Sequence, residues 1–166
     1  MKQTAKAGFK YLVEVIGADG FVRDREVIHN LMPVEGLNHL LGVALKSSAQ
    51  VATWYVGLYE GNYTPVPGDT AAGFPTSATE TTAYDETTRQ VLTLGAVLSG
   101  AVDNSANRAQ FTLNATKTIY GGFISSSSAK SSTSGILLSA VKFSSPKSLE
   151  SGEILRLTAG FTITSI

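Results

Sequence analysis

The chain has 166 residues, a length that suits one domain. Its 43% hydrophobic and 16% charged residues are typical of a folded protein and exclude a disordered or coiled-coil chain. Thirteen basic and thirteen acidic residues cancel, so the net charge gives no reason to expect a nucleic acid or an anionic membrane as a partner.

The first 33 residues predict an N-terminal hairpin. Apolar and polar residues alternate through residues 9–16, as in a half-buried strand, and the sequence G-A-D-G at 17–20 predicts a turn. Residues 21–31 can then return as a second strand. We expect residues 1–33 to form an arm and residues 34–166 to form the body, although the same hairpin would also fit as part of the body itself.

One short helix is expected, at residues 34–47. Leucine and alanine recur there at spacings of three and four, which predicts a buried face made by Leu37, Leu40, Leu41, Ala44 and Leu45. Beyond residue 51 the pattern favours strands, which we expect at residues 53–59, 89–94, 109–114, 118–125, 136–143 and 154–163. The fold class is therefore mainly β: an antiparallel β-sandwich or jelly roll with one helix and the hairpin arm.

Two segments between the predicted strands are unusual. Residues 60–88 hold three of the five prolines, and a connection of this length is either functional or packed over the surface or a neighbouring subunit. The serine-rich sequence SSSSAKSSTS at 125–134 predicts a flexible loop tip.

The residues that could carry chemistry form no recognisable motif. The two histidines, His29 and His39, lie in no metal or hydrolase pattern, and phosphate-loop and nucleophile-elbow motifs are absent. Residues 103–108 resemble a calcium loop only faintly and fit a β-turn better. Four acidic residues could supply the carboxylate pair of a glycosidase but are expected to be solvated charges: Asp69, Glu80, Asp85 and Glu86. We therefore predict that the protein is not an enzyme and that it has no catalytic, metal-binding or cofactor-binding residues.

Aromatic residues gather at Trp54, Tyr59 and Tyr63, where they could form a sugar-stacking platform or a protein interface. Alternation places Trp54 on the same face as Val56 and Leu58, so half of this group is expected in the core. The other half would be covered by residues 60–88 or by another subunit.

The absence of cysteine excludes disulfide scaffolds, thiolate metal sites and cysteine nucleophiles. No apolar run reaches the roughly 18 residues that cross a bilayer, and the first 20 residues lack the apolar region of a secretory signal. We expect a chain that is made and kept inside a cell.

Several segments together resemble a family of structural proteins from tailed-bacteriophage virions. They are G-L-N-H-L-L at 36–41, W-Y-V-G-L at 54–58, T-A-Y-D-E-T-T-R at 82–89, the serine-rich strand and loop at 122–128, and the C-terminal segment 143–155. The resemblance implies a capsid decoration, or cement, protein with a jelly-roll or similar β-sandwich body. Such a protein would be made in the host cytoplasm, form a small oligomer, with a trimer favoured, and bind the major capsid protein on the outer surface of the head.

On this hypothesis the hairpin arm would add a strand to a neighbouring capsid subunit. Its basic residues would meet an acidic surface and its apolar residues would anchor the contact: Lys2, Lys6, Lys10, Arg23 and Arg25, with Phe9, Tyr11, Val13 and Phe21. The alternatives are a tail, collar or other minor virion component, a carbohydrate-binding attachment module, and, last, a glycosidase.

Overall fold

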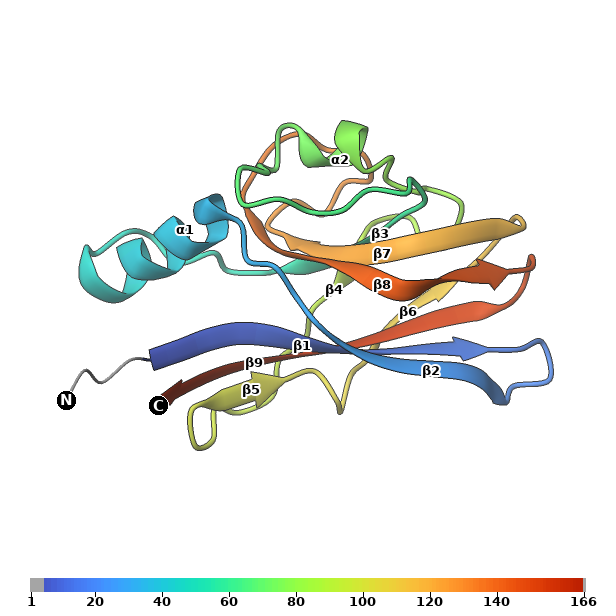
Figure 1. Cartoon of the computed structure of the whole chain (residues 1–166), viewed down its shortest axis with the longest axis horizontal. Coiled ribbons are helices and arrows are strands. Elements are labelled where there is room, and N and C mark those ends of the chain that lie inside the picture. The colour runs from blue at the N-terminus through green and yellow to red at the C-terminus, as the bar shows by residue number, and fades with distance from the viewer. Residues whose placement is uncertain (1–4, 166) are drawn as a thin grey trace.

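The structure is a computed structural model that describes residues 5–165. Its strands are β1 (Ala5–Ile16), β2 (Val22–His29), β3 (Tyr55–Tyr59), β4 (Gln90–Val91), β5 (Ala101–Asp103), β6 (Ala109–Thr112), β7 (Lys117–Ser125), β8 (Leu137–Leu149) and β9 (Ile154–Ser165). Its helices are α1 (Val34–Leu45) and α2 (Phe74–Ser77). The strands form two antiparallel sheets, ordered β2-β1-β9-β5, with β6 also paired to β9, and β4-β3-β7-β8. The predicted antiparallel β-sandwich is confirmed (Figure 1).

Strand β1 lies in the middle of its sheet. It pairs with β9 along its whole length and with β2 on its other side, as far as Lys10. The alternation that predicted a half-buried strand holds, because Tyr11, Val13 and Val15 are buried against the opposite sheet. The hairpin is thus an integral part of the sandwich, which was the alternative to a separate arm.

The main core lies between the two sheets. Both sheets contribute fully buried side chains to it, among them Phe111 and Leu155 from one sheet and Ile119 and Ile124 from the other. Burying an aliphatic or aromatic side chain of this size is worth about 1.5–3 kcal/mol. Packing of this kind is the main source of stability in a chain that contains no cysteine.

A second, smaller core lies on the outer side of the sheet β4-β3-β7-β8. The long connection, residues 60–88, folds back over that sheet and contains α2 (Figure 1). Its Phe74 packs edge-on against Tyr59 and in a tilted geometry against Phe123. Of the two interpretations of this connection, packing over the surface is therefore correct, and the helix count rises from the predicted one to two in residues 5–165.

Strand β8 continues six residues beyond its predicted end at 143. The sequence S-S-P that follows looks like a turn, but the Ser144 amide donates to the Glu26 carboxylate of β2, and Lys147 forms ion pairs with Asp24 and Glu26. These contacts hold the edges of the two sheets together. The three-residue strand β5 was not predicted, because it is too short to show alternation.

Candidate functional site

Three of the four acidic residues considered for glycoside hydrolysis bond to other parts of the chain, and the fourth, Asp85, is exposed as expected. Asp69 accepts hydrogen bonds from the Tyr63 hydroxyl and the Val66 amide, and the Glu86 carboxylate accepts from Thr112. Glu80 was expected to be a solvated charge, but its side chain is 1% exposed. That expectation is wrong for Glu80, whose carboxylate is paired with a buried arginine, and for Asp69, which is also buried.

The arginine is Arg89, which is fully buried. Its guanidinium donates two hydrogen bonds to Glu80, Nε to Oε1 at 2.8 Å and Nη2 to Oε2 at 2.6 Å. It also donates to the carbonyl oxygens of Ser127 and Ser132, and the Ser131 amide donates to Glu80. The serine-rich segment is therefore folded around a buried ion pair, and the prediction of a plain flexible tip is wrong.

The histidines and the turn at 103–108 also have structural surroundings. His39 packs edge-on against Trp54, with ring centroids 5.5 Å apart, and His29 lies on β2 opposite Lys10. The Asn104 side chain is buried and bonds to the backbone of β9, which supports the interpretation of residues 103–108 as a turn. Within residues 5–165, no group of three or more acidic or histidine side chains is arranged to hold a metal ion.

The aromatic residues at 54–63 do not share one exposed face. Tyr59 is fully buried beneath residues 60–88, and Trp54 is partly buried against the main core. Tyr63 packs on Phe74 and donates its hydroxyl to Asp69. Trp54 lies on the core side with Val56 and Leu58, as the alternation predicts. Residues 60–88 cover Tyr59, which was one of the two covers considered.

The residues predicted to contact a capsid divide into two groups. Phe9, Tyr11 and Val13 are buried in the sandwich and are core residues in this structure. The exposed residues at the tip and edge of the hairpin are Phe21, Arg23, Arg25, Lys6 and Lys10. Arg23 lies against Glu153. Lys2 lies outside the described residues. A contact with a capsid protein stays a prediction for the exposed group.

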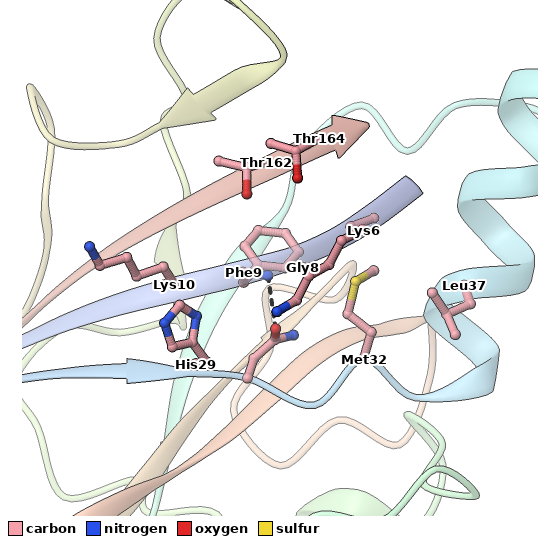
Figure 2. Close-up of a pocket in the computed structure, with 11 residues that line it drawn as sticks. Lys6, Gly8, Phe9, Lys10, His29, Met32, Leu37, Thr162 and Thr164 are labelled. Carbon is pink, nitrogen blue, oxygen red and sulfur yellow. Dashed lines mark hydrogen bonds between the residues drawn. The ribbon is translucent and has the colours of Figure 1, made fainter. Parts of the chain in front are cut away.

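One end of the sandwich carries a groove of about 490 Å³ between β1, the end of β9 and α1. Figure 2 shows Lys6 and Met32 pointing into the space between β1 and the segment that leads to α1. Leu37 of α1 lies at the end of this space. The Thr162 and Thr164 side chains of β9 complete one wall. The groove is lined by basic, polar and apolar groups and by no acidic residue among those described.

The helix α1 beside this groove presents an apolar stripe away from the body. Leu37, Leu41 and Leu45 are 40%, 57% and 74% exposed, whereas Leu40 packs against the core. The sequence predicted all of these leucines on one buried face. The difference arises at Gly36, where a Cβ atom would lie 2.5 Å from the Leu138 carbonyl oxygen. The helix packs on β8 through this glycine, and its leucine stripe turns outward.

Further apolar side chains lie on the loop that leads into β5, on the same end of the molecule (Figure 1). Val97 and Leu98 are 76% and 75% exposed, and Ile163 of β9, which is bonded to Gly100, is 54% exposed. Exposed apolar side chains that gather at one end of a molecule are typical of protein contacts. We call the α1 stripe, the groove and this loop the α1 end. No local sequence pattern predicts the groove, because it is made by segments far apart in the chain.

Comparison with known proteins places the chain in context. A family model described as podophage GP4 fiber I protein gp80 matches residues 28–164. The match begins at the end of β2 and includes every later strand and both helices. No curated protein matches the chain. Neither helix in residues 5–165 is long and apolar enough to cross a membrane.

Proposed function

Because this chain belongs to the podophage GP4 fiber I protein gp80 family and is a structural protein of a phage virion, we propose that it is a subunit of a virion fiber, part of the tail apparatus. The observation that carries this proposal is the match to a fiber family over residues 28–164. The tail component, one of the alternatives to the head decoration protein, thus becomes the favoured assignment.

The segments that resembled virion proteins in general do not distinguish a fiber from a head decoration. In this structure they have packing roles: residues 36–41 lie in α1, residues 54–58 enter β3, and Arg89 joins residues 82–89 to the serine-rich segment. A sandwich of this kind needs those contacts in any part of a virion. The family match, and not these segments, therefore favours the fiber.

The α1 end is the surface through which such a subunit would assemble. A fiber subunit must bind its neighbours by surface contacts, and the leucines of α1 together with Val97 and Leu98 leave apolar area uncovered in the single chain. We propose that the protein acts by these contacts and not by catalysis. A homo-oligomer, with a trimer favoured, stays part of the proposal.

The copy number of the chain in purified virions tests the fiber assignment. Quantitative mass spectrometry would compare this chain with the major capsid protein, and the portal protein would serve as a control of known low abundance. A fiber subunit is expected at a small fraction of the capsid protein. A ratio near parity would contradict the fiber and would favour a decoration protein bound to the major capsid protein.

A further inference from the structure

We propose that the groove at the α1 end receives an extended segment of another virion protein, which adds a strand to the open edge of β1. The partner segment would alternate apolar side chains with aspartate or glutamate. This inference rests on the proposed function in one respect: the chain must be assembled with another virion protein. The groove would bind the added strand in the same way in a fiber or on a head.

The edge of β1 is open because β2 ends before β1 does. β2 pairs with β1 between Lys10 and Ile16, and Asn30 closes the pairing by exchanging two hydrogen bonds with the backbone of Phe9, at 2.8 and 3.1 Å. The next residue, Leu31, bonds instead to Ala140 of β8. The chain thereby leaves the sheet, and residues 5–8 of β1 are paired only with β9 among the described strands.

The backbone of Ala7 is directed to this open side. In an antiparallel ladder both backbone polar groups of a residue point to one neighbour, and the direction alternates along the strand. Because the N–H and C=O of Phe9 point to Asn30, those of Ala7 point the same way, where β2 no longer runs. Ala7 therefore offers a donor and an acceptor to an added strand, which is how strand addition gains affinity.

The two sides of the groove differ in chemistry, which defines the partner. Side chains of a strand alternate between the faces of its sheet, so an added strand would direct every second side chain to Met32 and Leu37. The intervening side chains would lie on the outer face, beside Lys6, Lys10 and His29 (Figure 2). Apolar residues suit the first side and acidic residues suit the second.

The charges at the groove favour a different protein over a second copy of this chain. Within residues 5–165, the ion pairs involve neither Lys6 nor Lys10, so both ammonium groups are free to meet carboxylates of a partner. Pairing of β1 with the β1 edge of a second copy would bring the lysines of both copies onto one face. Like charges in that arrangement oppose the contact.

The first test blocks the edge without altering the ladder inside the chain. In Ala7→Pro the lost N–H is the one that faces the open side, so the pairing with β9 keeps its hydrogen bonds. Phage particles grown with this variant as their only copy should contain about tenfold less of the chain, measured by mass spectrometry. Circular dichroism of the purified variant checks its fold. Incorporation equal to the unaltered chain would overturn the proposal.

The second test reverses charge and does not depend on tolerance of proline. Lys6→Glu combined with Lys10→Glu should lower incorporation about tenfold, since both exposed side chains would then repel an acidic segment. The matched control is Lys46→Glu, at an exposed lysine outside the groove lining, which should leave incorporation unchanged. Equal effects of the groove and control variants would overturn the role of charge.

The third test identifies the occupant in assembled particles. A photo-crosslinking amino acid at position 7 should join this chain to an extended segment, rich in alternating apolar and acidic residues, of a different virion protein. A crosslink to a second copy of this chain, or to a segment without acidic residues, would refute the proposed partner. The copy number of the chain answers the fiber question separately, so either proposal can fail while the other stands.

Discussion

Replacing Arg89 by methionine is expected to destabilise the chain severely. Arg89 is fully buried and is bonded to both carboxylate oxygens of Glu80 and to two backbone carbonyls of the serine-rich segment. The Arg89→Met variant keeps a side chain of similar length but leaves the Glu80 carboxylate buried without its cation. The Ser131 amide would then be its remaining donor among these contacts.

The size of the effect follows from the burial of both partners. Removing one member of a buried ion pair costs about 3–5 kcal/mol. For a domain of this length, 1 kcal/mol changes Tm by about 2–4 °C, so Tm should fall by about 6–20 °C. The control is Arg25→Met: the Arg25 side chain is 63% exposed and 3.8 Å from Glu14, which keeps its ion pairs with Arg108 and Arg156. Loss of such an exposed arginine should cost about 0–1 kcal/mol.

Urea unfolding followed by circular dichroism and by Trp54 fluorescence would measure both variants. The double variant Arg89→Met with Glu80→Met should be more stable than Arg89→Met alone, because it no longer buries a lone charge. It should still be less stable than the unaltered chain, since the carbonyls of the serine-rich segment lose their donors. A loss below about 1 kcal/mol for Arg89→Met would refute this account of the buried pair.

Three further changes test other parts of the structure. Burial raises the pKa of Glu26, but hydrogen bonds from Lys147 and Ser144 outweigh it and hold that pKa below its ordinary value of 4.5. This stabilisation is complete above pH 4.5 and is lost as pH falls through the lowered pKa, so Lys147→Met should weaken the acid dependence of the urea midpoint. Gly121→Ala should reduce expression of folded protein, since its methyl group would clash with the Val141 carbonyl. Leu41→Glu should leave Tm within about 2 °C but reduce incorporation into virions.

The sequence predicted the strands more reliably than their surroundings. Alternation at residues 9–16 identified β1, but a strand in a detached arm and a central strand both bury one face, so the pattern could not separate the two. Likewise the leucine spacing located α1 but assigned the wrong buried face. Packing is decided there by Gly36, whose small size lets the helix approach the carbonyl oxygens of β8.

The buried ion pair and the groove depend on contacts that no local pattern records. Glu80 and Arg89 lie in a segment that looks like a polar connection, and they are bonded to backbone atoms of the serine-rich segment, 51 and 38 residues later. The groove combines the start of β1, the end of β9 and α1, three elements distant in sequence. Only the early end of β2 leaves the β1 edge open, and strand ends are the part of a strand that sequence locates least well.

The position of the chain in the virion tests the central claim most directly. Gold-labelled antibody against this chain, imaged by electron microscopy on purified virions, would locate it, and an antibody against the major capsid protein would mark the head as a control. A fiber subunit predicts gold at the fibers of the tail, with heads unlabelled. Gold distributed over the head lattice would contradict the fiber assignment and would return the chain to the decoration proteins.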